Sequence, residues 1–179
     1  MKKILIISSS LRGGSNSEIL AHEAEKGAKD AGNDVEFLSL KGKEIKFCIG
    51  CLSCQKTLKC VQKDDMENLI GKVQSADVIV FVTPIYYYEM SGQLKTFLDR
   101  CNPLYPQKNN FKDVYLITSS YDTSERAADK VINGLKGWID CFEKARFAGC
   151  LVGGGIDEPK AAQQRVDLLK KAYELGKNI

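Results

Sequence analysis

The sequence predicts an α/β fold, in which a parallel sheet of five strands is covered by helices on both faces. Short apolar runs alternate about five times with segments whose apolar residues recur at helical spacing. The connections between them are short, and no internal repeat or linker-like stretch interrupts the sequence. The 179 residues, 1–179, are therefore expected to form one domain that is large enough to bury a core.

The first half of the chain opens with an apolar run of the kind found in strands that are buried on both faces. The helix that follows is expected to end at Gly32-Asn33, and Asp64 with Glu67 marks the start of the next one. The expected elements are a strand at 4–8, a helix at 20–31, a strand at 35–40, a cysteine-rich loop at 48–60 and a helix at 66–73.

The second half contains the most apolar run of the sequence, Asp77 to Thr83, which we place at the centre of the sheet and expect Pro84 to end. The final helix is expected to start at Asp157-Glu158-Pro159, with Val166, Leu169 and Tyr173 facing inward. The elements between are a helix at 94–101, a turn at Pro103 and Pro106, a strand at 114–118, a helix at 128–142 and a strand at 146–152.

Composition and charge restrict the class of protein. Apolar residues make up 44% of the chain and charged residues 27%, as in ordinary globular proteins. The net charge is +3 and the basic residues are scattered, so nucleic acid is not expected as a partner. There is no secretory signal at the start and no apolar run of roughly 20 residues, so we expect a cytoplasmic protein without a membrane segment.

The stretch Ser8 to Ser17 follows the first strand and is rich in serine and glycine. Such a loop presents backbone N–H groups, hydroxyls and a helix N-terminus to one point, which suits a phosphate, and Arg12 adds a fixed positive charge. A plain turn with Ser15 and Glu18 as a capping box explains the same residues. Neither a dinucleotide fingerprint nor a P-loop is present, so this stretch alone leaves both interpretations open.

Three loops are expected at the carboxyl ends of the strands, where ligands of parallel sheets bind: Ser8 to Ser17, Pro84 to Met90, and Ser119 to Thr123. We therefore expect them to form the walls of one pocket. The second loop carries Tyr86-Tyr87-Tyr88, which offers an apolar shelf to a flat ring. The same aromatic side chains suit a protein interface, and both roles are compatible.

The three loops, in this order, resemble those of the NAD(P)H-dependent FMN reductase branch of the flavodoxin-like superfamily. The resemblance rests on the Ser-x-Arg loop with Ser15-Asn16-Ser17, on the run from Pro84 to Tyr88 with Leu94-Lys95 and Asp99-Arg100, and on Ser119-Ser120-Tyr121. It covers residues 1 to 155 and implies a flavodoxin-like, doubly wound sheet of strand order 2-1-3-4-5. It also implies a homodimer or a dimer of dimers.

The resemblance implies a bound FMN and identifies residues for each part of it. The phosphate would be held by Ser10, Arg12, Ser15, Asn16 and Ser17. The ribityl chain and one edge of the ring would follow Pro84, Ile85, Tyr86, Tyr87 and Tyr88, and the other side would be bordered by Ser119, Ser120 and Tyr121. Because the flavin carries the chemistry, no catalytic side chain is expected, and Lys95, Asp99 and Arg100 are expected on a solvated helix face.

Four cysteines, Cys48, Cys51, Cys54 and Cys60, are spaced as C-x2-C-x2-C-x5-C. This spacing resembles the motif of iron-sulfur flavoproteins, which implies a 4Fe-4S cluster that exchanges electrons with FMN and a ferredoxin-like partner. It also resembles a cysteine stretch of flavin reductases that have no demonstrated cluster. A cluster, a tetrahedral zinc site and free thiols therefore remain open. Cys101, Cys141 and Cys150 lie on apolar faces and are expected in the core.

We therefore expect an FMN-dependent oxidoreductase that takes hydride from NADPH or NADH and reduces a second acceptor, such as a quinone, free flavin or another small molecule. The first alternative is an iron-sulfur flavoprotein that passes electrons between a ferredoxin-like protein and FMN. The second alternative is a flavin-binding redox sensor without turnover. Detecting turnover with any acceptor separates the enzyme from the sensor.

Overall fold

A parallel sheet forms the centre of the molecule. The structure is a computed structural model, which describes residues 1–179 apart from the side chain of Glu125. Its parallel strands are β1 (Lys3–Ser8), β2 (Asp34–Ser39), β3 (Val78–Tyr86), β5 (Asp113–Ser119) and β6 (Arg146–Gly153). They lie in the order β2-β1-β3-β5-β6, and the short strand β4 (Glu89–Met90) pairs antiparallel with the end of β3. Counted without β4, this is the predicted order 2-1-3-4-5, which is confirmed.

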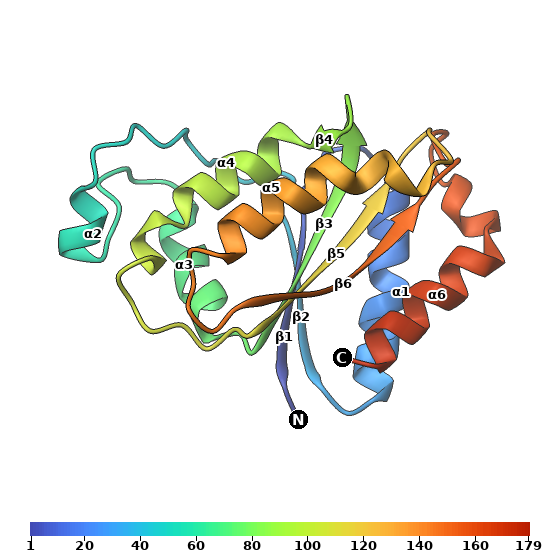
Figure 1. The fold of residues 1–179 in the computed structure, drawn as a ribbon, viewed down its shortest axis with the longest axis horizontal. Helices are drawn as coiled ribbons and strands as arrows, with labels where there is room; N and C mark the ends of the chain where they lie inside the picture. The colour runs from blue at the N-terminus through green and yellow to red at the C-terminus, as the bar shows by residue number, and fades with distance from the viewer.

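The helices form one layer on each face of the sheet (Figure 1). On one face lie α1 (Asn16–Asp30) and α6 (Val166–Lys177), and on the other lie α3 (Met66–Ser75), α4 (Gly92–Arg100) and α5 (Asp129–Ile139). Successive residues of β3 contribute to opposite layers: Ile79 and Phe81 pack toward α3, α4 and α5, whereas Val80 packs toward α1 and α6. This explains why β3 is apolar along its length.

The two helices α1 and α6 pack with their backbones in close contact. A Cβ atom added to Gly176 would lie 1.8 Å from the carbonyl oxygen of Ala24, and one added to Gly27 would lie 2.1 Å from the carbonyl oxygen of Tyr173. Because α1 begins at the Ser8 to Ser17 loop, this packing also fixes the direction from which the helix approaches that loop.

Pro84 does not end β3, contrary to the prediction. Pro84 pairs in register with Ser119 at the last position of the parallel ladder, and the strand continues to Tyr86. Ile85 and Tyr86 then pair with β4 instead. A proline lacks only its own N–H donor. Pro84 lies where the pairing changes from β5 to β4, so the strand continues past it.

The final helix begins at Val166 and not at residues 157–159 as predicted. Residues Ala161–Gln164 form a short 3-10 helix, η3, and Val166 is 74% exposed. The buried face of α6 consists of Leu168, Ala172 and Gly176, with Leu169 partly buried. The loop before the helix is held by hydrogen bonds to the side chain of Asn16. The sequence around residues 157–166 does not predict these contacts, because Asn16 is distant in the chain.

Two of the three cysteines expected in the core are on the surface. Cys101 is buried, as predicted, but Cys141 and Cys150 are exposed. Cys141 lies just beyond the end of α5, and Cys150 lies on β6, which is the edge strand of the sheet and is less covered than β3. None of the helices in the described chain is long and apolar enough to cross a lipid bilayer.

Candidate functional site

The three predicted loops line one cavity of about 220 Å³ at the carboxyl ends of the strands. The expectation of a shared pocket is therefore confirmed. A fourth segment, after β6, adds two residues that the sequence analysis did not include. The run Gly153-Gly154-Gly155 after the last strand is the signal that could have indicated it. The cavity is lined by Ser10, Arg12, Ser15, Asn16, Pro84, Ile85, Tyr86, Ser119, Ser120, Tyr121, Ile156 and Asp157.

The first loop leads directly into the amino end of α1. Ser15 caps the helix, since its Oγ accepts a hydrogen bond from the backbone N–H of Glu18 at 3.3 Å. The Oγ atoms of Ser15 and Ser17 are 3.1 Å apart, although Ser17 is fully buried and does not line the cavity. The exposed Arg12 donates from Nη1 to the carbonyl oxygen of Asp157 at 2.6 Å. The loop thus places a cation and a helix N-terminus beside the cavity.

Asn16 connects the first loop to the fourth segment. Its Nδ2 donates to the carbonyl oxygens of Ile156 at 3.2 Å and Glu158 at 2.8 Å, and its Oδ1 accepts from the N–H of Ala162 at 3.0 Å. The amide therefore makes its hydrogen bonds within the protein. Its contribution to the cavity is to hold the wall formed by Ile156 and Asp157.

A buried group of hydroxyls joins the ends of β1 and β3 to the start of α4. Ser9 donates from Oγ to the carbonyl oxygen of Val82 at 2.9 Å, and Ser91 donates from Oγ to Ser9 Oγ, also at 2.9 Å. The hydroxyl oxygen of Thr83 accepts from the N–H of Ser91 at 3.0 Å. Ser91 also caps α4 by accepting from the N–H of Leu94. This role of Ser9 and Ser91 was not predicted from the sequence, although the position of Ser91 shortly before a helical pattern is typical of a helix cap.

The second loop is a tight turn between β3 and β4 that presents tyrosines to solvent. Tyr87 and Tyr88 have positive φ angles of 51° and 64°, which side-chain-bearing residues rarely adopt. Tyr87 is 99% exposed, and Tyr86 and Tyr88 are about half exposed. Of the three, only Tyr86 lines the cavity. Strained backbone that displays exposed aromatic rings beside a cavity is typical of a functional site.

Replacing Tyr87 by glycine is expected to leave the free energy of unfolding unchanged or to raise it by up to about 1 kcal/mol. Glycine adopts the positive φ without strain, and an exposed ring loses little packing. Tyr105 is a matched control, because it is 57% exposed but has a φ of −55°. Tyr105→Gly should lower stability. Urea unfolding checks both variants, and a clear loss of stability in Tyr87→Gly would contradict the assignment of strain to this turn.

Comparison with known proteins identifies the family. The model of the NADPH-dependent FMN reductase family matches residues 2–149. The chain belongs to this family. It is 31% identical over 183 residues to an iron-sulfur flavoprotein of Archaeoglobus fulgidus, covering 100% of this chain and 79% of the relative. It is 30% identical over 161 residues to YwqN of Bacillus subtilis, whose name assigns it to the NAD(P)H-dependent FMN-containing oxidoreductases, covering 86% of this chain and 85% of that one.

Solved structures support the fold of this FMN reductase family member. An NAD(P)H:quinone oxidoreductase from Methanothermobacter marburgensis superposes with a TM-score of 0.72 at 15% identity, covering 99% of this chain and 96% of the other. The chain is thus a flavodoxin-like oxidoreductase of the NAD(P)H-dependent FMN reductase type, with FMN as cofactor and NAD(P)H as electron donor. The chemistry of the cavity fits FMN, since a guanidinium, hydroxyls and a helix N-terminus suit a phosphate and a tyrosine lies at the rim.

The four clustered cysteines lie away from this cavity, on a segment that projects from the body of the fold and contains the short helix α2 (Ser53–Thr57) (Figure 1). Cys48 and Cys51 are exposed, Cys60 is partly exposed, and Cys54 is buried. Within the part of the chain that the structure describes, no three His, Cys, Asp or Glu side chains are grouped so that they could hold a metal ion.

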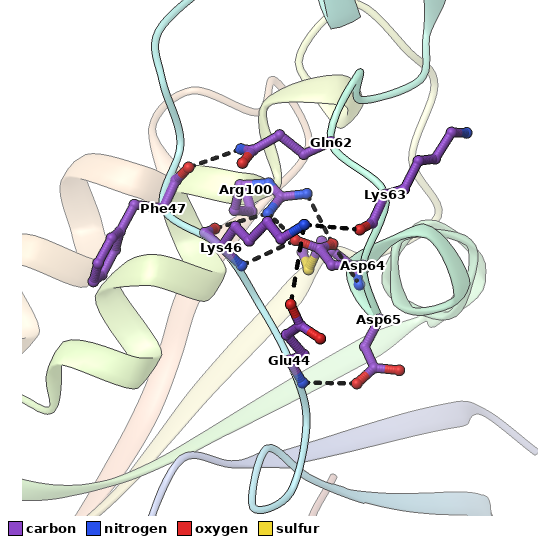
Figure 2. A network of polar contacts seen from close by, with 9 residues as sticks. Glu44, Lys46, Phe47, Gln62, Lys63, Asp64, Asp65 and Arg100 are labelled. Carbon is purple, nitrogen blue, oxygen red and sulfur yellow. Dashed lines mark hydrogen bonds and ion pairs between the residues drawn. The ribbon is translucent and has the colours of Figure 1, made fainter.

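Arg100 lies in the interior, where the sequence analysis expected a solvated face. Its guanidinium pairs with the carboxylate of Asp64, with Nη1 2.6 Å from Oδ2 and Nη2 3.0 Å from Oδ1, and the two side chains are 1% and 0% exposed (Figure 2). Lys95 and Asp99 do form an exposed pair, as expected. Burial alone would raise the pKa of Asp64, but hydrogen bonds from Arg100 and from two backbone N–H groups hold that pKa below its ordinary value.

Proposed function

We propose that this FMN reductase family member transfers reducing equivalents from NADPH or NADH to a small-molecule acceptor, such as a quinone or free flavin. The observation that supports this best is the single cavity in which the three loops meet. It has cationic and hydroxyl donors on one side and tyrosines at its rim. An open rim leaves room for a visiting substrate, and aromatic side chains suit a flat ring.

Each wall has a proposed role in holding FMN, which when bound supplies the hydride-accepting centre. The first loop would hold the phosphate, with Ser10, Arg12 and Ser15 lining the cavity, Ser17 supporting Ser15, and Asn16 fixing the opposite wall. The second wall consists of Pro84, Ile85 and Tyr86, and the third of Ser119, Ser120 and Tyr121. Tyr121 is 78% exposed and, with Tyr87 and Tyr88, would contact the acceptor or a second copy of the chain in a homodimer.

Steady-state oxidation of NADPH and NADH by the FMN-loaded protein tests this proposal. Quinones, free flavin and azo dyes serve as acceptors, and free FMN at equal concentration without protein is the control. We expect turnover with at least one acceptor and faster oxidation of one nicotinamide than of the other. Bound FMN without turnover for any acceptor would contradict the enzyme and favour a redox sensor.

A second candidate function is that of an iron-sulfur flavoprotein that exchanges electrons with a ferredoxin-like protein. The specific observation in its favour is that all four thiols, Cys48, Cys51, Cys54 and Cys60, lie on one segment with cluster-like spacing. The Archaeoglobus fulgidus relative that carries this name aligns along the whole chain. Iron and sulfide analysis of protein purified without oxygen tests it. Near-zero iron, with FMN present, would remove this candidate.

A further inference from the structure

Hydrogen bonds join residues 44–46 to residues 64–65 at the base of the cysteine loop, which we define as residues 47–63. Asp64 accepts from the N–H of Lys46 at 2.9 Å, and Arg100 donates from Nη1 to the carbonyl oxygen of Lys46 at 2.7 Å (Figure 2). Asp65 adds two contacts, accepting from the N–H of Glu44 at 2.7 Å and donating its own N–H to Glu44 at 3.0 Å. The Asp64–Arg100 ion pair therefore joins both ends of the loop to α4.

Beyond this base, packing against the core contributes little to the position of the loop. Five of its large apolar side chains are 45 to 79% exposed, and Cys54 is its buried apolar residue. Leu52 and Leu58, on either side of α2, have positive φ angles of 58° and 60°. A loop with exposed apolar groups and strained backbone depends on its polar anchors. The exposed residues are Phe47, Ile49, Leu52, Leu58 and Val61.

The short 3-10 helix η1 (Asn102–Leu104), which follows α4, also contacts the loop at the thiols themselves. Asn102 donates from Nδ2 to Cys54 Sγ at 3.3 Å and accepts from Gln55 Nε2 at 3.2 Å. Arg100 Nε is buried without a hydrogen-bond partner among the residues that the structure describes, and the thiol of Cys60 lies beside this guanidinium. Arg100, at the end of α4, and Asn102, at the start of η1, thus connect this part of the chain to the base of the loop and to two of its four cysteines.

We propose that Asp64 and Arg100 are positioning residues for the cysteine loop: they hold its two ends together, so that less of the loop has to be ordered when its four thiols gather around a metal ion. Joining the ends in advance lowers the entropy that is lost when the thiols gather. The positioning role rests on the contacts above. Only the metal centre rests on the second candidate function.

The test compares Asp64→Asn with Asp99→Asn, which alters the exposed Lys95–Asp99 pair on α4, the helix that carries Arg100. Thiol alkylation is followed residue by residue by mass spectrometry. Asp64→Asn leaves a buried guanidinium without its counter-charge, so the loop should open to hydrate it. We expect Cys54 to be labelled about tenfold faster or more, in line with the loss of a charged hydrogen bond. Cys101, buried in the core, should stay protected, and Asp99→Asn should behave like the wild type.

Two outcomes would overturn the positioning role: unchanged labelling of Cys54, or equal acceleration at Cys54 and Cys101, which would mean that the pair supports the whole fold. If Asp64→Asn fails to fold, the paired variant Asp64→Leu/Arg100→Met takes its place. Replacing a buried ion pair by apolar residues usually preserves stability. In this protein the replacement also removes the hydrogen bonds that Asp64 and Arg100 make with the backbone of Lys46. Rapid labelling of Cys54 with a protected Cys101 is expected in this variant too.

The metal centre is tested separately by titrating the protein with Co²⁺ in the absence of oxygen. The absorption of cobalt–thiolate bonds measures the affinity. We expect the wild type to bind Co²⁺ and Asp64→Asn to bind it about 10- to 100-fold more weakly, as for other residues that orient metal ligands. A wild type that binds neither Co²⁺ nor iron would refute the four-thiol centre. The labelling experiment would still decide the role of Asp64 and Arg100.

Discussion

Replacing Arg12 by alanine is expected to weaken FMN binding by about 10- to 100-fold, which corresponds to the loss of a charge-assisted hydrogen bond. Arg12 contributes the guanidinium that lines the cavity, and its Nη1 is fixed by the carbonyl oxygen of Asp157. Riboflavin, which lacks the phosphate, should bind the variant and the wild type with nearly equal affinity. Fluorescence titration with both flavins measures these affinities.

Arg146→Ala is the matched control for this variant. Arg146 is another exposed arginine with a hydrogen-bonded guanidinium, here paired with Asp113, but it begins β6 at the opposite end of the sheet from the cavity. Its replacement should leave both affinities unchanged. Equal weakening of FMN and riboflavin in Arg12→Ala would show that Arg12 shapes the cavity rather than binding the phosphate, and no weakening would remove it from the site.

Gly176→Ala is expected to lower the free energy of unfolding by about 3 kcal/mol. The added Cβ would lie 1.8 Å from the carbonyl oxygen of Ala24, so α1 and α6 must move apart. Since α1 begins at the Ser8 to Ser17 loop, which we propose holds the phosphate, FMN binding should weaken as well. Gly71→Ala, in the middle of α3 with no atom within 4 Å of the new Cβ, should instead stabilise the protein by about 0.5 to 1 kcal/mol.

Urea unfolding of the two glycine variants, followed by circular dichroism, checks this contrast. Equal stability of Gly176→Ala and the wild type would mean that α1 and α6 do not pack as closely as described. It would also remove the explanation for the glycine at that position.

The sheet was predictable from the sequence because its signals are local. The apolar run of β3 predicted the central strand, and the alternation of strands and helices predicted the parallel sheet. The resemblance to a family added the strand order. The errors concern contacts between distant residues: Arg100 is buried because Asp64 reaches it, and α6 starts late because Asn16 holds the preceding loop. No periodicity near Arg100 or Val166 carries that information.

The candidate site was predictable in outline, because loops at the carboxyl ends of parallel strands converge by topology. The structure confirms one cavity for the three loops and adds Ile156 and Asp157, whose position depends on the turn after β6. Ser17, Tyr87 and Tyr88 do not line it. Contact of the individual residues with FMN stays a prediction.

The most direct test of the central claim, a cavity that holds FMN for reduction by a nicotinamide, is a single-turnover experiment without oxygen. The FMN-loaded protein is mixed with one equivalent of NADPH or NADH while flavin absorbance is recorded. We expect the absorbance of oxidised FMN to disappear with at least one nicotinamide and to return when a quinone is added. A protein that does not retain FMN, or a bound FMN that neither nicotinamide reduces, would contradict it.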